Sequence, residues 1–204
     1  MKQLFIPAKI KFEINAKKIF ELKLPKRIAI AYSIQFQETA SRIKKILSKN
    51  HEITQFIQVL GCSRPKFSKD TKAILLISSG KFHVVSLAYE TNLPVYILES
   101  DKLRKISDEE IDLIRKKKKS SYVNFLNSEK VGVLISTKPG QENLKKSLSL
   151  NKIIKNKQTY YFISDEINTK EFENFSEIQS WVNTSCPRLD FDSSVINLSD
   201  LERK

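Results

Sequence analysis

Short apolar runs alternate along the chain with segments whose apolar residues recur at helical spacing. The runs have the length of β-strands and lie at Arg27–Tyr32, Ala73–Ile77, Val95–Leu98, Val131–Ile135, Tyr160–Ile163 and Trp181–Asn183. Leu4–Ile6 is a shorter candidate for a seventh strand. Strands that alternate with helices usually lie parallel in one sheet and are joined by crossover helices. The pattern therefore predicts an α/β fold.

Helical periodicity is clearest in three segments. The first places four apolar residues on one helix face, namely Ala40, Ile43, Ile46 and Leu47. The second opens with Ser107 and Glu110, whose spacing is that of a capping box, in which each side chain satisfies a backbone donor at the helix start. We expect its apolar residues to face a core, these being Ile111, Ile114, Tyr122 and Phe125. Leu144 and Leu148 mark a third helix.

The chain contains an internal similarity. Residues 28–33 (IAIAYS) match residues 131–136 (VGVLIS), and in both places a Gln-Glu pair and then an amphipathic helix follow. This similarity predicts two copies of one unit, each a small parallel β-sheet flanked by helices, divided near Asn127. A shared strand-turn-helix pattern could also arise by chance.

The charge of the chain is strongly basic, with a formal net charge of +13. Such a balance raises the question of nucleic acid, because lysine and arginine neutralise phosphates. Lysine is nevertheless spread over nearly every segment, and the densest run, Lys116–Lys119, falls inside the helix predicted after Ser107. We interpret this run as a solvated helix face and expect no nucleic-acid partner. A basic RNA-binding module remains as an alternative that rests on charge alone.

No apolar stretch approaches the roughly 18–20 residues that cross a bilayer, and no secretory signal pattern is present at the N-terminus. We therefore expect no membrane partner and a cytoplasmic location. Two cysteines, Cys62 and Cys186, predict no disulfide framework. In a reducing compartment such thiols either bind metal or are inert.

Three of the four glycines lie in predicted loops, where glycine permits positive φ or the close approach of a ligand. Gly61 precedes Cys62, Gly80 precedes His83, and Gly140 follows a strand directly. Loops at the carboxyl ends of parallel strands are where open α/β sheets bind ligands. Each signal also has a plain structural explanation, because a free cysteine is often buried and inert and His83 could cap or pack.

Cys186 has the more informative surroundings of the two cysteines. Pro187 and Arg188 follow it immediately, just past a predicted strand. We expect this setting to be partly exposed and electropositive, which favours the thiolate.

Taken together, several segments resemble a known family. The first half contains, besides the strand and helix from Arg27 onward, LFIPA (4–8), QVLGC (58–62), SSGKFH (78–83) and LPVYIL (93–98). The second half contains STKPGQ (136–141), SDEI (164–167) and WVNTSCPRLDFD (181–192). In order and spacing they resemble the 2-(3-amino-3-carboxypropyl)histidine synthase family of diphthamide biosynthesis, over essentially the whole chain.

The resemblance implies a radical enzyme of three related α/β domains, each of which gives one cysteine to a central 4Fe-4S cluster. Three thiolates leave one iron open for S-adenosylmethionine, and reduction yields a 3-amino-3-carboxypropyl radical. The fragment is added to a histidine of translation elongation factor two. The cluster supplies the electron, and the protein supplies ligation and orientation.

The resemblance also assigns residues. Cys62 matches the middle-domain cluster ligand and Cys186 the last-domain ligand. Two loops are expected to border the S-adenosylmethionine pocket, the first through Ser79, Gly80 and His83 and the second through Thr137, Pro139, Gly140 and Gln141. Arg188 could pair with a substrate carboxylate, since guanidinium matches that planar geometry.

The chain departs from the family pattern at its start. It begins at what would be the end of the first domain, so we expect residues 1–126 to hold the tail of that domain and the middle-type domain, and residues 127–204 the last-type domain. The first cluster cysteine is then absent, and two cysteines cannot supply the usual thiolates of a four-iron cluster. A separately encoded first domain or a homologous subunit could complete the site, or the chain is a non-catalytic remnant or a truncated gene product. Our leading hypothesis is a subunit or fragment of the transferase, and the alternative is an accessory subunit of a diphthamide synthase complex.

Overall fold

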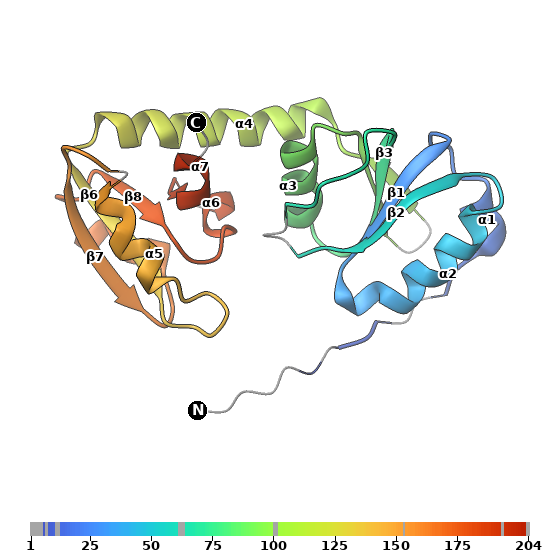
Figure 1. The fold of residues 1–204 in the computed structure, drawn as a ribbon, viewed down its shortest axis with the longest axis horizontal. Coiled ribbons are helices and arrows are strands. Elements are labelled where there is room, and N and C mark those ends of the chain that lie inside the picture. Colours follow the sequence, from blue (N-terminus) through green and yellow to red (C-terminus); the bar gives the residue numbers. More distant parts are fainter. Residues whose placement is uncertain are drawn as a thin grey trace. The chain divides into compact units, whose positions relative to one another are not determined.

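The computed structural model of the chain describes residues 6, 8–10, 13–60, 64–99, 102–152, 154–192 and 194–202, with residues 81–83, 151–152 and 191–192 described by their backbone alone. The chain divides into two compact units, Met1–Ile111 and Asp112–Lys204 (Figure 1). The division falls near the start of helix α4 (Asp108–Asn127), whereas the sequence placed the domain boundary at the end of that helix. The domain boundary stays a prediction.

The first unit is built on a sheet that, in the described part of the chain, has five strands in the order β2-β1-β3-β4-β5. Its strands are β1 (Arg27–Tyr32), β2 (Glu52–Gln58), β3 (Ala73–Ile77), β4 (Val95–Glu99) and β5 (Lys102–Lys105). The first four are parallel, and β5 adds an antiparallel edge. Three of them are strands that the sequence predicts.

Helices cover both faces of this sheet (Figure 1). Helices α1 (Ala16–Phe20) and α2 (Gln37–Leu47) bury Ile19, Ala40, Ile43 and Leu47 against alternate residues of β1 and β3. Helix α3 (Lys81–Thr91) packs beside β4. The central strands are therefore buried on both faces, which is why they read as continuous apolar runs.

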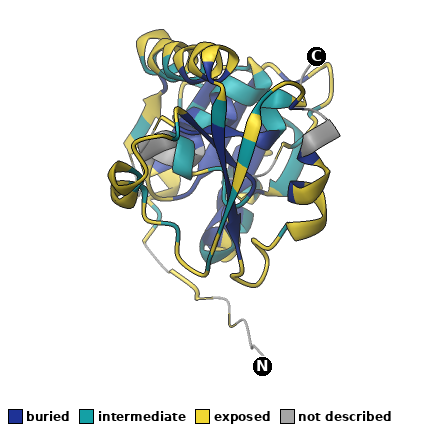
Figure 2. Ribbon diagram, turned by 90° about the vertical axis from the view of Figure 1, so that its left-hand side faces the viewer, coloured by how far each residue is buried: buried dark blue, intermediate teal, exposed yellow. Residues whose placement is uncertain are grey.

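The second unit repeats the arrangement with four described strands in the order β7-β6-β8-β9, all parallel. They are β6 (Lys130–Ser136), β7 (Gln158–Ser164), β8 (Ser180–Asn183) and β9 (Ile196–Asn197). Around them lie α5 (Leu144–Leu148), η2 (Ser149–Lys152), η3 (Thr169–Asn174), α6 (Leu189–Asp192) and α7 (Leu198–Leu201). Figure 2 shows the buried strands enclosed by elements whose outer surfaces are exposed.

The two sheets share one topology. In each, the first strand lies centrally, the second strand pairs on one side of it, and the third pairs on the other. The fourth strand then adds beside the third. This confirms the predicted fold class, two α/β units of parallel strands flanked by helices, with β5 as an antiparallel addition.

A close contact organises the second core. Trp181 of β8 pairs with Gly132 of β6, clusters with Leu134 and stacks on Phe172 with ring centroids 4.1 Å apart. Gly132 lies under the indole, where an added Cβ would fall 2.4 Å from Trp181 Cε3. Glycine is therefore required at this position of β6 by space.

The capping box is confirmed at the start of α4. Glu110 N–H donates to Ser107 Oγ (3.2 Å), and Ser107 N–H donates to the Glu110 carboxylate (3.1 Å). Farther along the helix Phe125 is buried as expected, and Ile111 and Ile114 are half-buried. The expectation was wrong for Tyr122, which is exposed, because the inward face passes through Ser121 instead.

Leu144 and Leu148 mark a helix as expected, although both are exposed and α5 turns Ser147 inward. One further expectation needs correction. The run Lys116–Lys119 is not wholly a solvated face, since the side chain of Lys118 is only 18% exposed and pairs with Asp190 and Asp200. Of the predicted strand Leu4–Ile6, residues 4 and 5 lie outside the described residues, and Ile6 is not in a strand.

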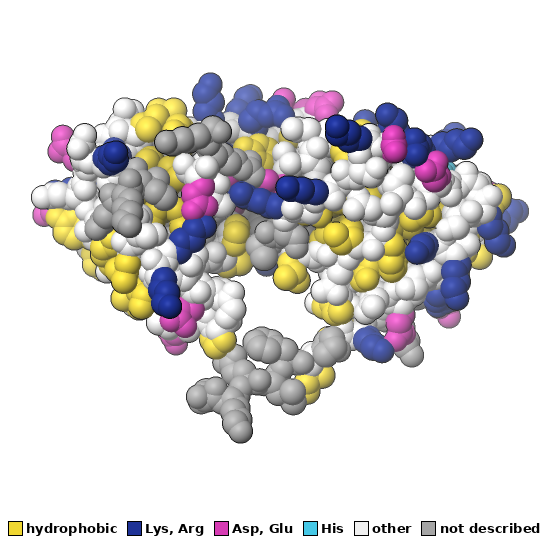
Figure 3. Space-filling view, viewed as in Figure 1, with side chains coloured by type: hydrophobic (Ala, Val, Ile, Leu, Met, Phe, Trp, Pro, Cys, Tyr) yellow, Lys and Arg dark blue, Asp and Glu magenta, His cyan; other side chains and the backbone are white. Residues whose placement is uncertain are grey.

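Among the helices that the structure describes, none combines the length and the apolar character needed to span a bilayer. Lys and Arg side chains on the face shown in Figure 3 are distributed over both units, with Asp and Glu among them.

Candidate functional site

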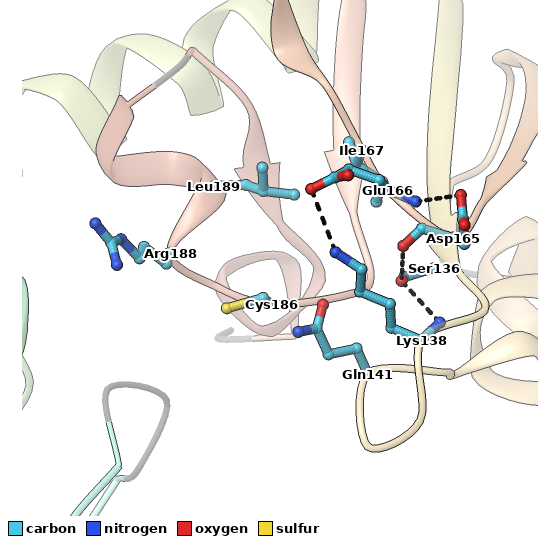
Figure 4. A pocket seen from close by; sticks show the side chains of 9 residues that line it. All are labelled: Ser136, Lys138, Gln141, Asp165, Glu166, Ile167, Cys186, Arg188 and Leu189. Carbon is cyan, nitrogen blue, oxygen red and sulfur yellow. Dashed lines mark hydrogen bonds and ion pairs between the residues drawn. The ribbon is translucent and has the colours of Figure 1, made fainter. Parts of the chain in front are cut away.

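The carboxyl ends of β6, β7 and β8 border a cavity of about 190 Å³ in the second unit. The loops that follow these three strands line it with Ser136, Lys138, Gln141, Asp165, Glu166, Ile167, Cys186, Arg188 and Leu189 (Figure 4). This is the edge at which parallel α/β sheets bind ligands, because the strand ends and the loops after them converge there.

The loop after β6 is a tight turn shaped by Pro139 and Gly140. Gln141 N–H donates to Lys138 O at 2.9 Å, and Gly140 has φ +79°. Proline followed by a residue with positive φ is the sequence of a type II turn. The turn brings Lys138 and Gln141 to the cavity at its two ends.

The loop after β7 presents acidic groups to the cavity. Ser164 Oγ donates to Glu166 O (2.7 Å), which folds the backbone back after the strand. Lys138 Nζ then lies 3.4 Å from Glu166 Oε1, as Figure 4 shows. Both side chains are largely exposed, so water screens this ion pair and its contribution to stability is small.

The loop after β8 carries Cys186 and Arg188. Cys186 is a free, half-buried cysteine, and Arg188 is exposed. In Figure 4 the Cys186 sulfur and the Gln141 amide face the same open side, while Arg188 extends away from the Lys138–Glu166 pair. The loop is fixed in part by Ser185, whose Oγ accepts a hydrogen bond from Ser136 N–H (2.9 Å).

A buried charged group lies behind this loop. Lys118 of α4 contacts Asp190 of α6 (2.5 Å) and Asp200 of α7 (2.8 Å). Burial lowers the pKa of Lys118, but its attraction and hydrogen bonds to the two carboxylates outweigh burial and raise that pKa above its usual value. Burial raises the pKa of the Asp190 carboxyl, and Lys118 opposes that rise. This ion cluster ties α4 to the elements that follow Cys186.

The structure brings three of the sequence-predicted site residues together at the cavity, namely Gln141, Cys186 and Arg188. Thr137, Pro139 and Gly140 build the exposed loop that carries Gln141. Sequence reasoning did not single out Lys138, Asp165 or Glu166 as site residues. Their positions could have indicated this role, because each follows directly after one of two neighbouring strands and lies in a segment that resembles the family.

The remaining predicted residues belong to the first unit. Ser79 and Gly80 are exposed in the loop after β3, and Gly80, with φ +90°, is the N-cap of α3. Cys62 and the side chain of His83 lie outside the described residues. Their roles stay predictions.

The described residues contain no group of three or more His, Cys, Asp or Glu side chains arranged to hold a metal ion. Cys186 does have the chemistry of a single ligand to iron, since its sulfur is reachable from the cavity and is not in a disulfide. The second unit therefore fits the role of one contributor to a shared cluster.

The sequence matches a family model described as "Putative diphthamide synthesis protein" over residues 1–196. The chain belongs to this family. Curated relatives agree with the match. The 2-(3-amino-3-carboxypropyl)histidine synthase subunit 1 of Encephalitozoon cuniculi is 24% identical, with 94% of this chain and 58% of that protein covered. The 2-(3-amino-3-carboxypropyl)histidine synthase of Methanocaldococcus jannaschii is 29% identical, with 84% of this chain and 48% of that protein covered.

Solved structures show the same fold. Dph2 from Pyrococcus horikoshii, determined with a 4Fe-4S cluster, superposes with a TM-score of 0.74 at 24% identity, covering 86% of this chain and 56% of that one. The chain thus spans about half the length of the relatives that it matches.

Proposed function

We propose that this chain provides cluster ligands and part of the substrate pocket of an enzyme of diphthamide synthesis. The reaction is transfer of the 3-amino-3-carboxypropyl group from S-adenosylmethionine to a histidine of translation elongation factor two. The observation that carries the proposal is Cys186, a half-buried thiol on a cavity at the carboxyl ends of three parallel strands, in a chain of this family.

The cofactor of this proposal is a 4Fe-4S cluster held by Cys62 and Cys186 together with a third cysteine from another polypeptide. The support for the cofactor is the structure of Dph2 from Pyrococcus horikoshii, which was determined with a 4Fe-4S cluster. When bound, the cluster supplies the electron that cleaves a carbon–sulfur bond of S-adenosylmethionine. A separately encoded first domain or a homologous subunit would supply the third cysteine, and the relative named as subunit 1 of the synthase supports such a partner.

The cavity suits one end of S-adenosylmethionine. Its volume of about 190 Å³ is below the roughly 300–1,000 Å³ of complete ligand pockets, so it would hold only part of that molecule. The amino acid end carries a carboxylate and an ammonium group. Lys138 matches the first, and Arg188 would meet it by rotating from its position in Figure 4 toward the cavity. Asp165 and Glu166 match the second. Gln141 can donate to one or accept from the other.

Anaerobic reconstitution with iron and sulfide tests the cluster assignment. The purified chain alone should take up little iron, and uptake should rise when the portion of the M. jannaschii relative outside the matched region is added. Cys62→Ala and Cys186→Ala should each lower that uptake. A full cluster in the isolated chain carrying both substitutions would refute the proposal.

The accessory role is separated from the catalytic one by transfer assays on the assembled enzyme. Radiolabelled S-adenosylmethionine and elongation factor two serve as substrates. Loss of transfer in either cysteine variant supports a catalytic subunit, whereas unchanged transfer in both variants supports an accessory subunit that stabilises a partner.

A further inference from the structure

Two buried asparagines lie directly behind the Cys186 loop. Asn183 ends β8 and Asn197 ends β9, and only 2% and 3% of their respective surfaces are exposed. Asn183 Nδ2 donates to Asn197 Oδ1 at 2.7 Å. Buried amides are costly unless they are hydrogen-bonded, so their partners indicate what they hold in place.

The partners of Asn183 are backbone groups next to the cysteine. Its Oδ1 accepts from Ser185 N–H (2.9 Å), and its Nδ2 donates to Cys186 O (2.8 Å). Asn197 contacts the backbone one residue farther along, where its Nδ2 donates to Pro187 O at 3.1 Å. The two side chains therefore hydrogen-bond to backbone groups on both sides of the Cys186 Cα.

The orientation of both amides is set by groups that can only accept. Asn197 Nδ2 also donates to Asp190 Oδ2 (2.7 Å), which in turn receives a hydrogen bond from Lys118. Carbonyl and carboxylate oxygens accept only, so a flipped amide would place oxygen against oxygen. The ion cluster around Lys118 thus fixes the direction of Asn197, and Asn197 fixes that of Asn183.

The backbone of Cys186 has little remaining freedom. The residue after it is proline, which fixes its own φ and restricts the conformation of the residue before it. Leu189 N–H and Asp190 N–H donate to Cys186 O and Pro187 O as α6 begins. The remaining freedom of Cys186 is mainly rotation of its side chain. A fixed backbone of this kind favours a preorganised metal ligand.

We propose that Asn183, supported by Asn197, is a positioning residue that holds Cys186 in the orientation needed for ligation. The inference rests on the proposed function of Cys186 as a cluster ligand. It adds that these two amides, which do not touch the cavity, determine how that thiol is presented.

The test uses the full chain carrying Cys62→Ala, in which Cys186 is the only thiol, and measures its alkylation by iodoacetamide. Asn183→Leu removes all three hydrogen bonds without adding charge, and Asn183→Asp keeps only the bond from Ser185. We expect alkylation of the folded protein to change about tenfold in Asn183→Leu and at least as much in Asn183→Asp, because Asp sets a buried carboxylate oxygen against Cys186 O and Asn197 Oδ1.

Two controls separate positioning from loss of stability. Asn124→Asp breaks an exposed amide-to-carbonyl bond, to Gln179 O, in the same unit but away from Cys186. Gly132→Ala destabilises the core through the Trp181 ring while leaving Asn183, Asn197 and their hydrogen-bond partners unchanged in the sequence. Alkylation through global unfolding increases with low concentrations of urea, whereas alkylation through a loosened loop does not. If Asn183→Leu does not fold, Asn183→Ala and Asn197→Ala give the same comparison, because each removes the amide without adding charge.

The outcomes distinguish the two proposals. A changed, urea-independent rate in the Asn183 variants and an unchanged rate in both controls supports the positioning role. Rates that follow stability in every variant overturn it, even if Cys186→Ala still abolishes iron uptake. If Cys186→Ala leaves iron uptake with the added partner portion intact, the proposed function fails whatever the alkylation rates are.

Discussion

Lys118 Nζ lies 2.5 Å from Asp190 Oδ2, although Lys118 belongs to a run of four lysines. We expect Lys118→Met to lower the free energy of unfolding by roughly 2–4 kcal/mol, because it leaves buried carboxylates without their cation. Equilibrium unfolding in urea measures this. Lys116→Met, in the same run but exposed, should change the stability by less than about 0.5 kcal/mol.

The same variant predicts a pH dependence. Burial raises the pKa of Asp190, and removing Lys118 raises it further, because the attraction of that ammonium opposes the rise. A raised folded pKa means that the folded protein binds the proton more tightly than the unfolded chain does, so acid relieves the uncompensated charge. The stability gap between wild type and Lys118→Met should therefore narrow as the pH falls from neutral toward the pKa of Asp190. A gap of constant size would contradict this account.

Gly132→Ala should destabilise the second unit by about 1–3 kcal/mol, because its Cβ would overlap the Trp181 ring. Thermal unfolding measures the change. The double variant Gly132→Ala/Trp181→Phe should lose less than the sum of the two single losses, since a smaller ring leaves room for the methyl group. Strict additivity would show that the contact is not the cause.

Ser107→Ala should cost about 1 kcal/mol, because Glu110 N–H loses its cap at the start of α4. Circular dichroism during urea unfolding measures the loss. Ser120→Ala is the matched control, being an exposed position inside the same helix, where alanine is favoured. Equal effects at both positions would argue against the capping box.

Arg188→Ala should raise the KM of the assembled enzyme for S-adenosylmethionine about tenfold or more, because a charge-assisted hydrogen bond to a carboxylate contributes roughly 1.5–3 kcal/mol. Steady-state kinetics of the transfer reaction measure this. Arg188→Lys should restore only part of the loss, since ammonium lacks the planar fork of guanidinium. Arg115→Ala, on the exposed side of α4, should leave KM unchanged.

The central strands could be predicted because burial on both faces makes them uniformly apolar, as in Ala73–Ile77. The two edge strands of the first sheet could not, whereas the edge strand β7 of the second sheet was predicted over Tyr160–Ile163. Glu52–Gln58 mixes Gln, Thr and Glu with apolar residues because it is only half-buried, and Lys102–Lys105 is charged because it ends the sheet. The two-residue strand Ile196–Asn197 is too short for any pattern.

Helix faces were harder to predict than helices. Ser121 and Ser147 occupy buried positions while Tyr122 and Leu148 are exposed, so hydrophobicity alone assigns the wrong faces. Ser147 tolerates burial because its hydroxyl lies within hydrogen-bonding distance of Asn143 O (2.7 Å) and Thr184 Oγ1 (2.8 Å). Such polar contacts between distant segments are not visible in a periodic pattern.

The sequence could predict those site residues that a single loop segment identifies, but not the contacts between loops. Cys186 and Gln141 come from recognisable segments, and the topology brings their loops to one edge. The pair Lys138–Glu166 and the support of Cys186 by Asn183 and Asn197 depend on three-dimensional packing. Each joins residues whose separate sequence contexts are unremarkable.

The strand β7 has a practical consequence for all of these experiments. It lies at the edge of the second sheet in the described part of the chain, its sequence QTYYFIS carries no charge, and Tyr160 and Ile163 are exposed on it. The first sheet instead ends in the basic strand β5, whose charges repel an added strand. Concentrated samples of the isolated chain should therefore self-associate through β7, and Ile163→Lys should keep them dispersed.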